Sequence, residues 1–119
     1  MEIKPCEMLL GITFSPRARQ ALLQILEMEH RQNINSEPFE EVINCKDYPC
    51  ITDGCYEKTV ARFYKLFSKW AVVIYKKYGN KYSETETGSI TDFDKILFFQ
   101  NYAFEDTVSL IKQYLQKLV

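Results

Sequence analysis

The segment between Tyr56 and Tyr78 limits most strongly what this chain can fold into. Large apolar residues recur along it at every third or fourth position, which is the spacing of one face of an α-helix. The members of this apolar stripe are Tyr56, Val60, Phe63, Phe67, Trp70, Ile74 and Tyr78. Asp53 can cap such a helix at its start, and Gly79-Asn80 can end it in the left-handed conformation. We therefore predict a long central helix over about residues 54–78, roughly 35 Å long at ~1.5 Å per residue.

Helix signals also occur near both ends of the chain. Ser15-Pro16 is a helix start, because serine can cap free N–H groups and proline is tolerated at the first helical position. This helix would run to about Gln32. The residues that we expect it to bury are Ala18, Ala21, Leu22, Ile25 and Met28, with Leu26 flanking them. A 4-3-4-3 spacing of apolar residues from Phe104 to Leu118 predicts a second helix to the C-terminus.

Two shorter helices complete the predicted set. Ser36-Glu37-Pro38 repeats the start signal and leads into one or two turns ending near Ile43. Thr91 or Asp92 would cap a helix over residues 93–101. These segments predict an all-α fold, a compact helical bundle of four to five helices in one domain spanning residues 1–119. Residues 1–14 would be an irregular or short-strand lead-in, and residues 80–90 a mobile polar loop.

Composition narrows the class of protein. Of the 119 residues 46% are hydrophobic, which is enough for one folded core. The net charge of −1 excludes a polycation that binds nucleic acid through its overall charge. The N-terminal residues lack a secretory pattern, and no apolar run approaches the ~20 residues that cross a bilayer. We expect a soluble cytoplasmic protein with reduced cysteines and no membrane association.

Basic residues gather on the side of the predicted central helix that faces away from its apolar stripe. They are Lys58, Arg62, Lys65, Lys69 and Lys76. Cations at helical spacing can follow the phosphates of a nucleic acid, and this basic ridge is the candidate nucleic-acid-binding surface. Such a ridge is more often simply the solvated face of a bundle helix. In a further alternative, the acidic segment 37–53 folds over the ridge and neutralises it.

Aromatic residues near the C-terminal side supply a candidate partner surface. Phe98 and Phe99 are adjacent, so on a helix they point about 100° apart and one of them must leave the buried stripe. With Tyr102 they would form an exposed apolar patch of the kind that binds a protein partner or a second copy. The alternative is a helix that is buried on two sides.

The cysteines and the single histidine supply weak chemical candidates. Cys45, Cys50 and Cys55 have C-x4-C-x4-C spacing, and with Cys6 or His30 they could hold zinc. The C-x2-C spacing of zinc knuckles is absent, so free thiols or a disulfide are the alternatives. His30 could act as a general base, although a lone histidine near a helix end is usually a surface residue.

No motif of a known catalytic class occurs in the sequence. We therefore expect a non-catalytic interaction or regulatory module without a cofactor, able to self-associate or to bind a protein partner. Nucleic-acid binding through the basic ridge is the alternative hypothesis. A metal- or thiol-based function at Cys45, Cys50 and Cys55 is the third.

Overall fold

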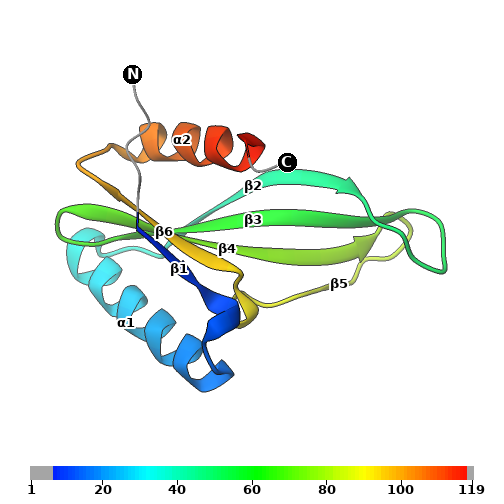
Figure 1. Ribbon diagram of the computed structural model, residues 1–119, viewed down its shortest axis with the longest axis horizontal. Coiled ribbons are helices and arrows are strands. Elements are labelled where there is room, and N and C mark those ends of the chain that lie inside the picture. Colours follow the sequence, from blue (N-terminus) through cyan, green and yellow to red (C-terminus); the bar gives the residue numbers. More distant parts are fainter. Residues whose placement is uncertain (1–6, 118–119) are drawn as a thin grey trace.

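The predicted all-α bundle is wrong, because most of the chain is β-sheet. A computed structural model describes residues 7–117, and these form a six-stranded antiparallel sheet with one α-helix on each face (Figure 1). The predicted central helix is in fact two long strands, β3 (Cys55–Lys65) and β4 (Lys69–Asn80). They pair along their whole length through a tight turn, in which the Leu66 N–H donates to the Lys69 carbonyl over 2.8 Å.

The other strands extend the sheet on both sides of this central pair. β2 (Phe39–Asp47) pairs with β3, and β6 (Lys95–Gln100) pairs with β4. β1 (Met8–Leu10) pairs with β6, and β5 (Glu86–Thr87) adds two residues to the far end of β4. The helices predicted over 36–43 and 93–101 are therefore also wrong. In β6 the residues Ile96, Leu97 and Phe99 are buried, whereas in β2 Phe39 and Val42 remain 38% and 50% exposed.

The run from Trp70 to Tyr75 shows why these segments form strands. Successive side chains of a strand point to opposite faces, and both faces of this sheet are covered. Ala71, Val73 and Tyr75 pack in the cluster beneath α1. Trp70, Val72 and Ile74 pack in the cluster beneath α2. A strand buried on both sides has no apolar–polar alternation, and its β-branched and aromatic residues suit a pleated surface.

The two terminal helices are confirmed. α1 (Pro16–Ile34) begins at Ser15, whose hydroxyl accepts from the Ala18 N–H over 3.1 Å, and it ends at Asn35 with φ of 60°. α2 (Phe104–Lys117) covers the opposite face of the sheet. Residues 118–119 and 1–6, with Leu118 and Cys6, lie outside the described residues.

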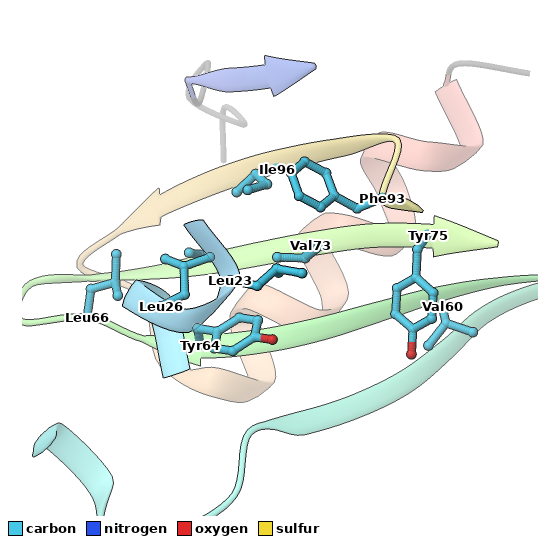
Figure 2. Packing of buried hydrophobic residues seen from close by; sticks show 10 residues of the cluster. Leu23, Leu26, Val60, Tyr64, Leu66, Val73, Tyr75, Phe93 and Ile96 are labelled. Atoms are coloured by element: carbon cyan, nitrogen blue, oxygen red, sulfur yellow. The ribbon is translucent and has the colours of Figure 1, made fainter. Parts of the chain in front are cut away.

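The buried face predicted for α1 is wrong for Ala18, Ala21, Ile25 and Met28, whereas Leu22 does pack against the core. Figure 2 shows Leu23 and Leu26 of α1 directed at Tyr64 and Val73 of the sheet. Ile25 is 56% exposed and Met28 63% exposed. The helix carries two apolar stripes, and only the one that includes Leu23 and Leu26 packs on the sheet.

The lead-in to α1 is fixed against the sheet by a close backbone contact. After β1 the chain makes the short 3-10 helix η1 (Gly11–Thr13), and a second one, η2 (Ile90–Asp92), precedes β6. A Cβ atom at residue 11 would collide with the carbonyl and ring of Phe93, so only glycine fits there. The Gly11 N–H donates to the Asp94 carbonyl over 2.8 Å. In the described residues neither α-helix is long and apolar enough to span a membrane.

Candidate functional site

The five residues of the predicted basic ridge do not share one surface. Their directions follow from the strand alternation: Lys58 and Arg62 point to the α1 face of the sheet, and Lys76 points to the α2 face. Lys65 and Lys69 flank the β3–β4 turn. The ammonium groups of these two lie 5.4 Å from the ring centre of Trp70 and 5.1 Å from that of Phe98, respectively.

Arg62 belongs to a half-buried polar network that joins α1, β2, β3 and β4. Its Nε donates to the Tyr64 hydroxyl over 3.1 Å, and its other nitrogens lie 3.4 Å from Glu27 and 3.6 Å from Glu40. The Tyr75 hydroxyl donates to Glu40. Burial raises the pKa of Tyr64 to about 12, so this phenol is neutral at physiological pH. The network holds these elements together, and at Arg62 an acid of the segment 37–53 does neutralise the base.

Lys58 is paired in a similar way near the far end of the sheet. Its ammonium lies 2.7 Å from the carboxylate of Glu86, which also accepts from the Tyr56 hydroxyl over 2.6 Å. The hydrogen bond from Lys58 lowers the pKa of Glu86. Lys58 and Arg62 thus have partners within the protein.

The aromatic residues proposed as a partner surface are largely buried. Phe99 is 3% exposed in the α2-side core, and Tyr102 packs edge-on against it with ring centres 6.4 Å apart. Phe98 is half-buried on the α1 side beneath Lys69. Phe98 and Phe99 are thus covered on two sides, but as neighbours in the strand β6 and not in the helix that the alternative assumed.

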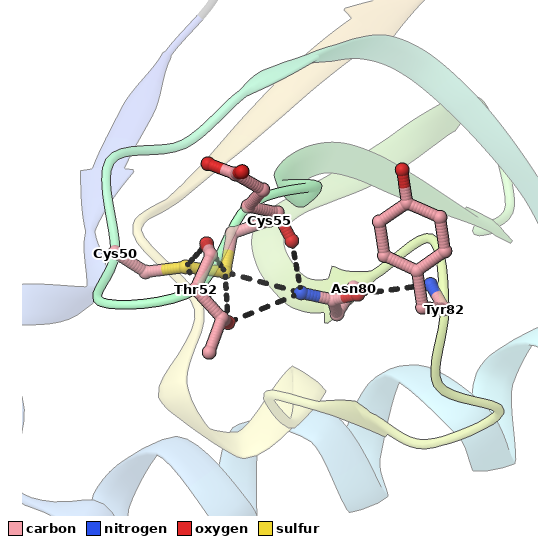
Figure 3. Close-up of a disulfide and its surroundings, with 6 residues drawn as sticks. Cys50, Thr52, Cys55, Asn80 and Tyr82 are labelled. Carbon is pink, nitrogen blue, oxygen red and sulfur yellow. Dashed lines mark hydrogen bonds between the residues drawn. A yellow bond between two sulfur atoms is a disulfide. The ribbon is translucent and has the colours of Figure 1, made fainter.

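Two of the three closely spaced cysteines are bonded to each other. Cys50 and Cys55 form a disulfide across the β2–β3 loop, and Cys45 is a free, exposed thiol on β2. Figure 3 shows Asn80 beside this loop, where its amide donates to the Asp53 carbonyl over 2.8 Å. Within residues 7–117, no three side chains of the metal-binding types gather to hold an ion.

His30 lies in the core between α1 and the sheet. Its side chain is fully buried, and its Nδ1 accepts from the Lys65 N–H over 2.8 Å. Aromatic rings of Phe39, Tyr64 and Trp70 surround it. A histidine in this position is a structural residue and has no path to a substrate.

A groove on the α2 face of the sheet brings together residues that the sequence keeps apart. It has a volume of about 420 Å³ and lies between the sheet and the last turns of α2. The strand register builds its centre, since Asn44, Thr59 and Lys76 are neighbours across β2, β3 and β4. A bulge at Ile43 shifts the register of β2 there. We call this cavity the lysine groove, after the four lysines that line it: Lys46, Lys76, Lys95 and Lys112.

The groove combines positive charge with an apolar floor. Asp94 is the one acidic residue among those lining it, so the lining carries three net positive charges. Lys46 is paired with Glu57 at 3.3 Å, which lowers the excess to two. The Lys76 ammonium donates to the Thr59 hydroxyl over 2.6 Å. Lys76, Lys95 and Lys112 have no ion pair in the described part of the chain.

Polar and apolar side chains complete the lining. Amides of Asn44 and Gln116 provide hydrogen-bond donors and acceptors, and Ile43, Ile74 and Leu115 supply the apolar surface. This combination of an apolar cavity with a few convergent polar groups is typical of small-molecule sites. The arrangement can bind an anion, since each lysine ammonium has three donors and a full charge.

Comparisons with protein-family models, curated protein sequences and solved structures give no match to this chain. The groove is therefore the feature of this molecule that best indicates a function. Sequence reasoning selected Lys76 but not the other three lysines. No spacing along the chain links Lys46, Lys95 and Lys112, and only the strand register brings them together.

Proposed function

We propose that this protein is a non-catalytic binding module that holds a small anionic ligand in the lysine groove. The observation that carries the proposal is the gathering of four lysines and a single carboxylate around one apolar-floored cavity. A cleft lined by one sign of charge and bounded by low-dielectric protein concentrates oppositely charged ligands. A bound anion would neutralise the positive charges of Lys76, Lys95 and Lys112, which have no ion pair in the described residues.

Substituting Lys76 with Gln should weaken anion binding about tenfold, the cost of one charge-assisted contact of roughly 1.5 kcal/mol. The adjacent Lys77→Gln variant is the matched control, because Lys77 points to the opposite face of β4 and does not line the groove. Pyrophosphate is a suitable probe. Amide chemical shifts of isotope-labelled protein, followed during a titration, report both the affinity and the place of binding.

Two results would remove the proposal. One is the absence of any pyrophosphate-dependent shift in the groove at millimolar concentration. The other is an equal loss of affinity in Lys76→Gln and Lys77→Gln, since that would show general attraction to a positive surface.

Self-association through α1 is a second candidate function, and the exposed stripe of this helix favours it. Ala18 and Ile25 are seven residues apart, as are Ala21 and Met28, and all four are exposed. This is the heptad spacing of a helix that packs on another helix. In an antiparallel pair of α1 helices the small Ala18 and Ala21 would lie opposite the larger Met28 and Ile25 of the second copy. Small residues opposite large ones allow two helices to interdigitate.

Light scattering at micromolar concentration should then show a dimer. We expect Ile25→Lys to raise its dissociation constant at least about tenfold, because the interface would bury a charge. Gln24→Lys, at the edge of the stripe, is the control for added charge. A monomer at all concentrations, or equal effects of the two variants, would contradict self-association through this face.

Nucleic-acid binding stays an alternative proposal with a narrow structural basis. Of the five basic residues predicted for it, only Lys76 lines the groove. This proposal requires that the protein binds an oligonucleotide. The binding must weaken as salt is added and in the Arg62→Glu, Lys65→Glu and Lys69→Glu variants. The absence of a gel shift at low salt would remove it.

The cytoplasmic location also stays a proposal, and the bond between Cys50 and Cys55 bears on it. Disulfides persist mainly in oxidising compartments and are rare in the cytosol. Alkylation of the protein under native conditions, followed by mass spectrometry, measures whether this pair is reduced in its own cells. A fully oxidised pair would count against the cytoplasm.

A further inference from the structure

The lysine groove joins a dense positive charge to an apolar floor, and a simple inorganic ion would use only the first of these. From this combination, and resting on the proposed function, we infer that the ligand is a small phosphate monoester that carries an apolar group. Its phosphate would lie among Lys76, Lys95 and Lys112, and its apolar group over Ile43 and Leu115.

Charge indicates a phosphate monoester rather than a carboxylate or a sulfate. The groove keeps two uncompensated positive charges after Asp94 and Glu57 are counted. A phosphate monoester carries about −1.5 to −2 at pH 7, because its second pKa is about 6, and it offers three strong acceptor oxygens. A carboxylate or a sulfate monoester carries a single charge and would leave one lysine unbalanced.

The Thr59 hydroxyl also favours phosphate binding in the groove, because it positions one of the lysines. It accepts from the Lys76 ammonium over 2.6 Å, which fixes the end of a long flexible side chain. Lysine loses considerable rotamer freedom when it binds a ligand, so an ammonium that is already held loses less. Lys76 is therefore the member of the set that we expect to contact the phosphate directly.

Size and surface indicate an organic group on the phosphate. A volume of about 420 Å³ falls within the range of roughly 300–1,000 Å³ that holds drug-sized ligands. Ile43 and Leu115 are only partly buried and supply apolar surface that a bare ion would leave wetted. Covering that surface with a ring or an alkyl group gains hydrophobic free energy.

Three probes of related shape separate these contributions in calorimetric titrations of the 119-residue protein. Inorganic phosphate presents the charge alone, phenyl phosphate adds an apolar ring, and phenyl sulfate keeps the ring but carries one charge. We expect phenyl phosphate to bind about tenfold more tightly than either of the others. Its affinity should also rise several-fold from pH 5 to pH 7, while that of phenyl sulfate stays level.

The outcomes distinguish this inference from the function on which it rests. Equal affinities for phenyl phosphate and inorganic phosphate would overturn the apolar group and leave anion binding intact. Equal affinities for phenyl phosphate and phenyl sulfate would overturn the doubly charged ligand. If none of the three probes binds and pyrophosphate also fails, the proposed function itself is wrong.

Leu115→Gln provides a variant test of the apolar contact. Leu115 is half-buried at the end of α2, so this change should weaken phenyl phosphate binding several-fold and leave inorganic phosphate binding unchanged. Gln113→Ala, at an exposed position of the same helix, is the control. Thermal unfolding of both variants confirms that α2 remains folded. An equal loss for both phosphate probes would place the effect of Leu115 in the fold and overturn its role in binding.

Discussion

Substituting Trp70 with Ala should lower the free energy of unfolding by about 3–5 kcal/mol, through lost transfer energy and the cavity that remains. Trp70 is only 5% exposed at the end of the sheet where both helices and β2 meet. Its ring centre lies 5.3 Å from that of Phe104 in α2 and 6.2 Å from that of Phe39 in β2. The indole therefore packs where α2 meets β2, beside the direct contact of Phe39 with Phe104, whose ring centres lie 4.7 Å apart.

Phe67→Ala is the informative comparison, because Phe67 and Trp70 belong to the same predicted helical stripe. On one face of a helix, both rings would be buried and both substitutions would be costly. In the structure, Phe67 occupies the β3–β4 turn and is 89% exposed. Its removal should change stability by no more than about 0.5 kcal/mol. Urea unfolding monitored by circular dichroism measures both values, and similar losses for the two variants would contradict the hairpin.

The spacing of three and four in Tyr56–Tyr78 is a coincidence produced by two strands and a turn. Val60 faces α1, whereas Phe63 and Trp70 face α2, so the stripe combines residues of both faces. A local signal for strands was present in the unbroken run from Trp70 to Tyr75, which is rich in β-branched and aromatic residues. Periodicity alone could not identify it, because a strand covered on both sides has no alternation to detect.

Local helix signals located both α-helices, although the same kind of start signal at Ser36-Glu37-Pro38 predicted a helix where the chain forms β2. Ser15-Pro16 and the 4-3-4-3 pattern after Phe104 located both α-helices correctly, since capping and amphipathic spacing act within a few residues. The buried face of α1 was not predictable in this way. The helix has one apolar stripe with Leu23 and Leu26 and another with Ile25 and Met28. Which stripe is buried depends on the position of the sheet, and the sequence prediction contained no sheet.

The residues of the lysine groove could likewise be predicted from the sequence only in part. Lys76 could be chosen from its neighbours in sequence, but its partners come from β2, β6 and α2. Strand pairing places Thr59 beside Lys76 across 17 residues of sequence. A site that the sheet register assembles becomes visible only after the register is known.

Acidification is expected to destabilise this protein through His30. Its Nδ1 accepts the Lys65 N–H, so in the neutral ring the proton sits on Nε2. Protonation of Nδ1 would place a donor against this donor inside the core. Burial lowers the pKa of His30. The charges of Arg62 and Arg31 act in the same direction, while the backbone and carboxylate of Glu37 oppose it.

The sign of the effect follows from this lowered pKa. The unfolded chain binds a proton at its ordinary pKa of about 6.5, while the folded chain still excludes it. The stability that the neutral His30 contributes is therefore fully present above pH 7. It decreases as the pH falls below about 6.5. Each further pH unit costs at most about 1.4 kcal/mol until the folded histidine also titrates.

His30→Asn isolates this contribution from the acids of the protein. The asparagine oxygen can take the position of Nδ1 and accept the Lys65 N–H, but it does not titrate. Urea unfolding at pH 5, 6, 7 and 8 should show a steeper loss of stability at low pH for the natural protein than for the variant. Carboxylates such as Glu86 affect both proteins alike and cancel in the difference. If the two proteins lose equal stability between pH 7 and pH 5, His30 is not the origin of the acid sensitivity.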